Sequence, residues 1–141
     1  MLPQTDANPA DRSVLIVEDS ENSAAMLEIA LSSIPGVRLL IANSAVDAWH
    51  TLSGGAAVHA VVTDLNMPRM DGFELIRRIR ESGRFDATPI VVVSADTDPD
   101  TPERIAQFGI SAFFAKPFSP AEVRRKLEQL LNATTQDAAT R

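Results

Sequence analysis

The sequence lacks the residues on which several classes of functional site depend. The 141 residues include no cysteine, which excludes disulfides, thiol nucleophiles and cysteine-ligated zinc or iron–sulfur centres. His50 and His59 are the only histidines, which is too few for most metal sites built on imidazole. We interpret both histidines as ordinary surface or packing residues.

Long apolar runs and an excess of positive charge are also missing. The longest apolar run has four residues, far short of the roughly 20 that span a bilayer. Residues 1–11 lack the basic and apolar regions of a signal peptide. Thirteen basic against nineteen acidic residues give a net charge of −6, which disfavours binding to nucleic acid or anionic lipid. We therefore expect a cytoplasmic protein with no direct nucleic-acid partner and no membrane partner.

The composition suits one domain flanked by two tails. Apolar residues make up 45% of the chain, enough for the core of a domain of this length. Residues 1–11 and 132–141 are small and polar without apolar periodicity, and we expect both to be flexible. This leaves residues 12–131 as the predicted domain, with no second output domain in this chain.

Short apolar runs alternate with longer helical patterns along this domain. The runs predict five buried strands, at Ser13–Val17, Val37–Ala42, His59–Thr63, Pro89–Ser94 and Ser111–Ala115. A helical pattern follows each strand, at Ser20–Ile34, Ser44–Ser53, Asp71–Ser82, Thr101–Phe108 and Ser119–Leu131. This strict alternation predicts an α/β fold with a doubly wound parallel sheet and helices on both faces.

Three of these helices have recognisable starting residues. Thr101 and Ser119 each precede a proline, so each hydroxyl is expected to cap a helix whose first residue is that proline. Asp71 is expected to cap the third helix. The arginines of that third helix, Arg80 among them, are expected to form a solvated face.

Acidic, hydroxyl and basic side chains follow the predicted strands at their carboxyl ends, where sheets of this kind bind ligands. Glu18 and Asp19 follow the first strand, Asp64 follows the third, Ser94 ends the fourth and Lys116 follows the fifth. Clustered carboxylates repel one another unless a cation shares them. The sequence therefore predicts a cation site at this edge of the sheet.

Magnesium suits such a site, because it prefers a few carboxylates, a carbonyl oxygen and several waters. We predict that Glu18, Asp19 and Asp64 supply the carboxylates and that Asn66 supplies its backbone carbonyl. Lys116 adds a fixed positive charge and Ser94 adds a hydroxyl donor. These groups would gather anionic oxygens around Asp64, an arrangement suited to accepting a phosphoryl group.

These residues resemble the receiver domain of two-component response regulators, in particular single-domain, chemotaxis-regulator-like members. The resemblance covers nearly all of the predicted domain and rests on four motifs in order: Val14–Asp19, Asp64–Gly72, Val93–Ala95 and Lys116–Phe118. The intervals of 30 residues from Asp64 to Ser94 and 22 residues from Ser94 to Lys116 match the family's usual spacing. The fold that this implies is the flavodoxin-like receiver fold.

The resemblance implies a role for each strand-end residue. Asp64 would take a phosphoryl group from the phosphohistidine of a histidine kinase or a histidine phosphotransfer protein. Glu18 and Asp19 would hold Mg²⁺, Lys116 would pair with the incoming oxygens and Ser94 would hydrogen-bond the phosphoryl group. Glu18 stands where the family often has Asp, and its longer arm favours contact with Mg²⁺ through a water molecule.

The resemblance also implies a switch and an output surface. Phe113 lies where the family carries an aromatic residue that swings inward behind the hydroxyl of Ser94. Phe113 has no hydroxyl of its own, so packing alone would drive its rotation, and a plain role in the core is the other interpretation. A downstream protein target is expected to bind the surface of the fourth helix, fifth strand and fifth helix.

Two positions are expected to set the lifetime of the phosphorylated state. By the same resemblance, Asn66 and Asp96 flank the path by which water reaches the phosphoryl group. Both side chains are short and polar, so neither shields the phosphoryl group from water. We expect dephosphorylation within seconds to minutes.

Two alternative functions stay open at this point. One is an aspartate-dependent phosphatase with Asp64 as its nucleophile. Such phosphatases usually place a general acid two residues later, where this chain has Asn66, which cannot donate a proton as an acid. The other is a receiver-like interaction module that is not phosphorylated, against which the intact acids and Lys116 count. We therefore expect a phosphoacceptor protein rather than an enzyme.

Overall fold

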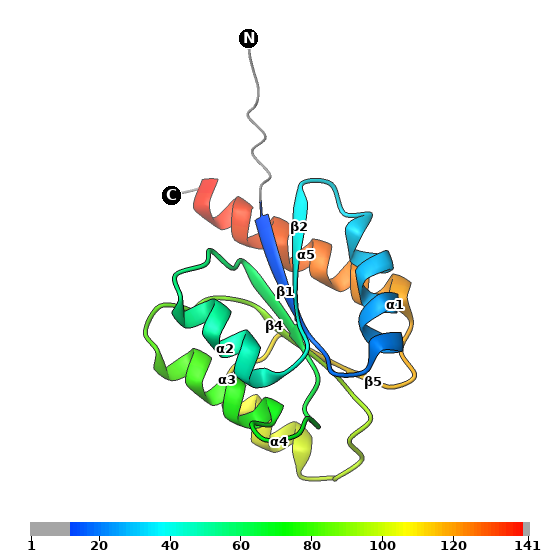
Figure 1. The fold of residues 1–141 in the computed structure, drawn as a ribbon. Coiled ribbons are helices and arrows are strands. Elements are labelled where there is room, and N and C mark those ends of the chain that lie inside the picture. The colour runs from blue at the N-terminus through cyan, green and yellow to red at the C-terminus, as the bar shows by residue number, and fades with distance from the viewer. Residues whose placement is uncertain (1–11, 140–141) are drawn as a thin grey trace.

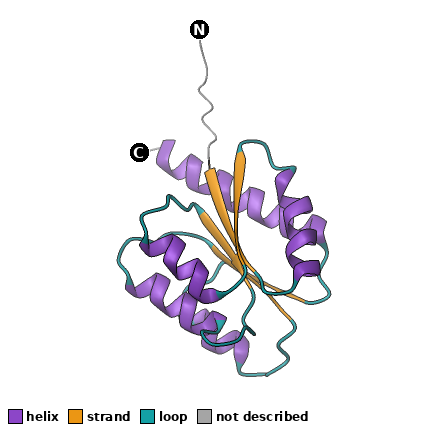
Figure 2. Cartoon of the chain, in the orientation of Figure 1, coloured by secondary structure: helices purple, strands orange, loops and turns teal. Residues whose placement is uncertain are grey.

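The computed structural model describes residues 12–139, which form one five-stranded parallel sheet between two layers of helices (Figure 1; Figure 2). The order of strands across the sheet is β2-β1-β3-β4-β5, so β2 and β5 form its edges. The strands are β1 (Arg12–Val17), β2 (Val37–Ala42), β3 (Ala60–Thr63), β4 (Ile90–Ser94) and β5 (Ala112–Ala115). The helices are α1 (Glu21–Ser32), α2 (Ala45–Ser53), α3 (Gly72–Glu81), α4 (Thr101–Ala106) and α5 (Pro120–Ala139).

The two layers of helices bury two separate apolar clusters against the sheet. Figure 1 shows α2, α3 and α4 on one face and α1 and α5 on the other. Successive residues of β1 enter different clusters: Leu15 packs with residues of α2, α3 and α4, whereas Ile16 packs with residues of α1 and α5. Both side chains are fully buried. This burial on both faces explains why the strands are continuous apolar runs.

The predicted α/β, doubly wound fold is confirmed, and apart from the end of α5 the strands and helices lie close to their predicted bounds. Ser119 caps α5, since its Oγ accepts a hydrogen bond from the Glu122 amide at 3.3 Å. Asp71 caps α3 by accepting from the Glu74 amide at 2.9 Å.

Two predictions about the helices are wrong. Asp100, not Thr101, occupies the N-cap of α4, because the Thr101 hydroxyl donates to the Asp96 carboxylate instead. The last helix also continues past the predicted end at Leu131 to Ala139, so the expected C-terminal tail is helical over residues 132–139. No glycine or proline lies between those two positions to end the helix.

The predicted N-terminal tail, residues 1–11, lies outside the described residues, as do residues 140–141. Among residues 12–139, no helix is long and apolar enough to cross a membrane.

Candidate functional site

The carboxyl ends of four strands bring the predicted site residues to one edge of the sheet. In the parallel register, Val17 of β1 pairs with Thr63 of β3, so the residues that follow these strands lie side by side. Ser94 pairs with Ala115 in the same way, at the ends of β4 and β5. The sheet therefore gathers Glu18, Asp64, Ser94 and Lys116 at this edge, as predicted.

Lys116 joins the two buried acids of the site. Its Nζ lies 3.0 Å from Oδ2 of Asp64 and 3.0 Å from Oε1 of Glu18. Burial by itself lowers the pKa of Lys116, but the close contacts with the negatively charged Glu18 and Asp64 outweigh burial and raise this pKa above its ordinary value. Lys116 is therefore a permanent positive charge between two carboxylates.

Glu18 is the most deeply buried acid of the site, with 2% of the residue exposed. Burial raises the pKa of Glu18, although Lys116 and the Ser20 amide act in the opposite direction. Its Oε2 accepts a hydrogen bond from that amide at 3.1 Å. Its Oε1 makes the ion pair with Lys116 but no hydrogen bond. One oxygen of a buried carboxylate is thus left with unsatisfied hydrogen-bonding capacity.

Three carboxylates converge closely enough to share a cation. Oxygen atoms of Glu18, Asp19 and Asp64 all lie within 4.8 Å of one another. Glu18 and Asp64 are buried, whereas Asp19 is exposed on the solvent side. An all-oxygen set with one partly unsatisfied buried oxygen and access to water fits a magnesium ion, which binds a few carboxylates and retains several waters.

The main chain fixes the orientation of the Asp64 carboxylate. Its Oδ1 accepts hydrogen bonds from the amides of Leu65 at 2.6 Å and Asn66 at 3.3 Å. With Oδ2 on Lys116, both carboxylate oxygens have donors. The side chain is therefore held in one orientation at the end of β3, with 6% of the residue exposed.

Gly72 packs directly against the main chain of Asp64 and Leu65. A Cβ atom at this position would lie 2.1 Å from the carbonyl oxygen of Asp64 and 2.6 Å from Cα of Leu65. The Gly72 amide also donates to the Leu65 carbonyl at 2.8 Å. The sequence predicted Asp71 only as the cap of the third helix and included Gly72 only as the last residue of the Asp64–Gly72 motif. Their place in a motif next to Asp64 was the available signal, but the close approach depends on how α3 packs beneath β3.

Ser94 is linked to the start of α4 through one acid. Ser94 is fully buried, and its Oγ accepts from the Asp96 amide at 3.1 Å. Oδ1 of Asp96 in turn accepts from the Asp98 amide at 2.8 Å and the Thr101 hydroxyl at 3.0 Å. Thr101 is 1% exposed. Sequence reasoning missed this role of Thr101 because its position before Pro102 suggested a helix cap.

The remaining predicted residues lie around this centre. Phe113 pairs with Val92 across the sheet and packs, half-buried, against the cluster beneath α2, α3 and α4. Phe114 packs against the opposite cluster. Asn66 is exposed beside Asp64, and Asp96 is half-buried.

Comparison with known proteins agrees with this arrangement. The family described as "Response regulator receiver domain" matches residues 14–128. The chain is 30% identical over 118 residues to chemotaxis protein CheY1 of Helicobacter pylori, covering 84% of this chain and 95% of that protein. It is 31% identical over 118 residues to the two-component response regulator ORR3 of Oryza sativa, covering 84% and 89% of the two chains.

Solved structures of receiver proteins have a fold similar to that of this chain. The response regulator receiver protein from Pseudomonas putida superposes with a TM-score of 0.77 at 31% identity, covering 85% of this chain and 98% of that one. Chemotaxis protein CheY4 of Vibrio cholerae gives the same TM-score at 26% identity, covering 86% and 99%. With its parallel sheet, its strand-end acids and its lysine, the chain belongs to the response regulator receiver domain family.

Proposed function

We propose that Asp64 is the phosphoacceptor of a phosphorelay and takes its phosphoryl group from the phosphohistidine of a histidine kinase or a histidine phosphotransfer protein. The observation that carries the proposal is the placement of Asp64, at the end of β3, 3.0 Å from Lys116 and within 4.8 Å of two further carboxylates. An Asp64 carboxylate oxygen forms the new bond to phosphorus while the phosphorus–nitrogen bond breaks. The imidazole leaves with the bonding electron pair.

The surrounding residues hold charge during this transfer. Lys116 already contacts Asp64 and is placed to pair with oxygens of the incoming group. Glu18, Asp19, Asp64 and the carbonyl of Asn66 would hold Mg²⁺, which neutralises negative charge on the phosphoryl oxygens. The two amides on Oδ1 hold the Asp64 carboxylate in place throughout.

This proposal makes the protein a signalling component and not a hydrolase that turns over substrate. Receiver family membership favours signalling. Asn66 is exposed beside Asp64 but has no acidic proton, which counts against the phosphatase alternative. The buried acids and Lys116 count against a receiver that is never phosphorylated. We place this activity in the cytoplasm.

Ser94 and Phe113 form the proposed switch. If Ser94 turns its hydroxyl toward the phosphoryl group, its hydrogen bond with the Asp96 amide is strained or lost. Asp96 also accepts a hydrogen bond from Thr101 at the start of α4, so a shift of Asp96 would reach this helix. Phe113 would then repack behind Ser94. The change would alter the face of α4, β5 and α5, where we propose that the downstream protein binds.

The lifetime of the phosphorylated state is proposed to depend more on Asn66 than on Asp96. The Asn66 side chain is exposed next to Asp64, whereas Oδ1 of Asp96 already accepts two hydrogen bonds. Replacement of Asn66 by Arg or Met should shield the phosphoryl group and lengthen its lifetime beyond the expected seconds to minutes. The rate of phosphate loss after kinase removal measures this. An unchanged rate in both variants would show that water access is controlled elsewhere.

Direct labelling tests the proposal. The protein is incubated with acetyl phosphate and Mg²⁺, and the adduct is located by intact-mass measurement and peptide mapping. Asp64→Asn should remove the adduct. Asp71→Asn, which changes an exposed acid that caps α3, should keep it. Persistent labelling of Asp64→Asn would overturn the assignment.

A further inference from the structure

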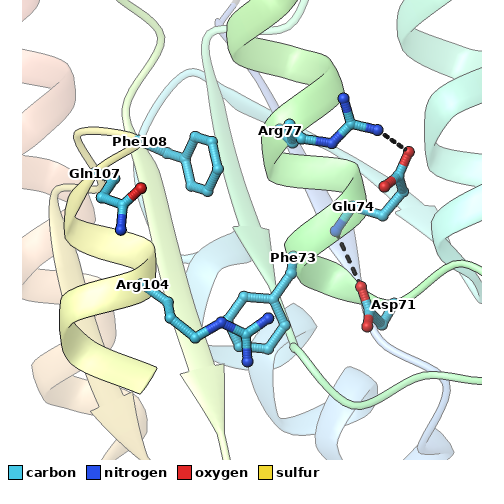
Figure 3. A pocket seen from close by; sticks show the side chains of 7 residues that line it. All are labelled: Asp71, Phe73, Glu74, Arg77, Arg104, Gln107 and Phe108. Atoms are coloured by element: carbon cyan, nitrogen blue, oxygen red, sulfur yellow. Dashed lines mark hydrogen bonds and ion pairs between the residues drawn. The ribbon is translucent and has the colours of Figure 1, made fainter. Parts of the chain in front are cut away.

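Two hollows outside the acidic site differ in how their charged residues are used. The groove between α3 and α4 has a volume of about 360 Å³, and its two acids and two arginines cancel in formal charge (Figure 3). Glu74 is bound by Arg77, and the guanidinium of Arg104 stacks 3.9 Å above the ring of Phe73. This groove therefore presents no excess charge to a ligand.

The second hollow lies at the amino ends of the strands, whereas Asp64 lies at their carboxyl ends. Arg12 begins β1, His59 precedes β3 and Pro89 precedes β4, so the six residues of β1 place it about 17 Å from the acidic site. The hollow has a volume of about 240 Å³. Its lining consists of Arg12, His59, Arg84, Ala87, Thr88, Pro89 and Leu131. None of these described residues is acidic, although the chain as a whole carries a net charge of −6.

Contacts within the fold orient two polar side chains of this lining, those of His59 and Arg84, as donors. Nδ1 of His59 accepts the Ser13 amide at 3.0 Å, so the ring proton is on Nε2. One N–H of Arg84 donates to the Leu52 carbonyl at 3.1 Å, and its guanidinium carbon lies 4.9 Å from the centre of the Phe85 ring. These two contacts fix the guanidinium and leave its other N–H groups available to a ligand.

The rest of the lining is apolar. Leu131 of α5 is 2% exposed, Pro89 is buried and Ala87 adds a methyl group. Asp86, which directly precedes Ala87 in the chain, is not among the described lining residues, and its charge acts on Arg80. A ligand would thus meet positive charge and N–H donors beside an apolar surface.

We propose that this hollow binds a small monocarboxylate whose remaining body is apolar. The fork of N–H groups on Arg84 matches a carboxylate, and Nε2 of His59 adds a donor. Ala87, Pro89 and Leu131 suit the apolar body. The volume lies below the roughly 300–1,000 Å³ of sites for drug-sized ligands, which limits the ligand to a short chain or a single ring.

Titration of the full chain with sodium hexanoate, followed by amide NMR shifts, tests this proposal. Hexanol supplies the same body without charge, and acetate supplies the charge without the body. Hexanoate should give saturable shifts centred on Ser13, His59, Thr88 and Leu131, and both controls should bind at least about tenfold more weakly. Arg84→Gln should weaken hexanoate binding about tenfold. Arg104→Gln removes the same charge from the other hollow and should not weaken it.

Several outcomes would overturn the proposal. These are shifts that do not saturate, shifts centred elsewhere, equal binding of hexanol, or equal weakening by the two arginine variants. N-acetyl-leucine mimics the C-terminal residue of a polypeptide. If it binds more tightly than hexanoate, the hollow binds a polypeptide C terminus and not a free small acid, and the proposal is wrong. Because unfolding of Arg84→Gln could mimic lost binding, His59→Phe is a second variant, and thermal unfolding of both is measured first.

Discussion

Glu18 and Glu74 carry the same carboxylate in two regions of the molecule, and their pKa values shift in opposite directions. Burial at the end of β1 raises the pKa of Glu18. On the exposed first turn of α3, hydrogen bonds from Arg77 and Arg78 lower the pKa of Glu74 to about 2. The two arginine side chains are 43% and 42% exposed, whereas the largely buried Lys116 contacts both Glu18 and Asp64.

The difference shows where an added cation matters. Glu74 has two guanidinium partners on its own helix, at i+3 and i+4, and needs nothing more. At the strand ends, two buried carboxylates, Glu18 and Asp64, share one lysine, and the exposed Asp19 lies beside them, which leaves an excess of negative charge. The strand-end region should therefore respond to Mg²⁺, and the surface of α3 should not.

The largest effect is expected at Gly72, which lies between these two regions. Gly72→Ala places a methyl group against the Asp64 carbonyl, so α3 or the main chain after β3 must shift, at a cost of about 3 kcal/mol of unfolding free energy. Denaturant unfolding measures this. The same variant should bind beryllium fluoride, a mimic of the phosphoryl group, more weakly because Asp64 is displaced.

Gly83→Ala is the matched control for that substitution. Gly83 has a φ of +80° and no neighbouring atom within 4 Å of an added Cβ. Its replacement should cost about 1 to 2 kcal/mol from backbone conformation alone and leave beryllium fluoride binding intact. Equal losses in both variants would mean that the contact between Gly72 and Asp64 has no special importance.

The next largest effect is expected for Glu18→Gln. The raised pKa of Glu18 means that the folded protein favours the protonated form of this side chain. The protonated form adds to the stability of the fold below the ordinary pKa of 4.5, and this contribution is lost as the pH rises through the raised pKa. Without Mg²⁺, the variant should therefore be more stable than the parent at pH 7, with a gap that closes toward pH 4.5. Its Mg²⁺ affinity should fall by roughly tenfold or more.

Calorimetry with Mg²⁺ and thermal unfolding across pH measure both parts of that prediction. Glu122→Gln, which changes an exposed acid on α5, is the control and should alter neither quantity. Unchanged Mg²⁺ affinity in Glu18→Gln would remove Glu18 from the metal site.

The smallest effect is expected for Glu74→Gln. The lowered pKa means that charged Glu74 stabilises the fold above 4.5 and that this contribution is lost as the pH falls toward about 2. The variant should melt slightly lower than the parent at pH 7, because exposed ion pairs contribute little. Glu103→Gln changes an acid in the first turn of α4 and controls for the helix dipole. A Mg²⁺-dependent change in Glu74→Gln would contradict the contrast between the two regions.

Much of the fold and the centre of the site could be predicted because both depend on local pattern. Apolar runs fix the strands, and a parallel sheet necessarily places the residues that follow its strands at one edge. Asp64 and Lys116 lie 52 positions apart in the chain, yet the structure brings them to 3.0 Å. Their separate positions after β3 and β5 were enough to predict this.

Features that depend on packing between helices could not be predicted in this way. Arg80 was expected on a solvated face, but its guanidinium donates to the carbonyls of Phe85, Phe108 and Gly109 and so ties α3 to the end of α4. A long side chain that reaches main-chain carbonyls leaves no periodic signal in the sequence. The hydrogen bond from the Thr101 hydroxyl to the Asp96 carboxylate likewise leaves no periodic signal and was not predicted.

We propose that a phosphoryl group on Asp64 changes β4, α4 and β5 through Ser94. Amide NMR spectra with and without beryllium fluoride and Mg²⁺ test it most directly. We predict Mg²⁺-dependent shifts concentrated around Asp64 and between Ser94 and Phe118. Ser94→Ala should keep the shifts around Asp64 and lose those beyond position 94. Shifts spread equally over α1 and α2, or identical spectra for the parent and Ser94→Ala, would contradict the account.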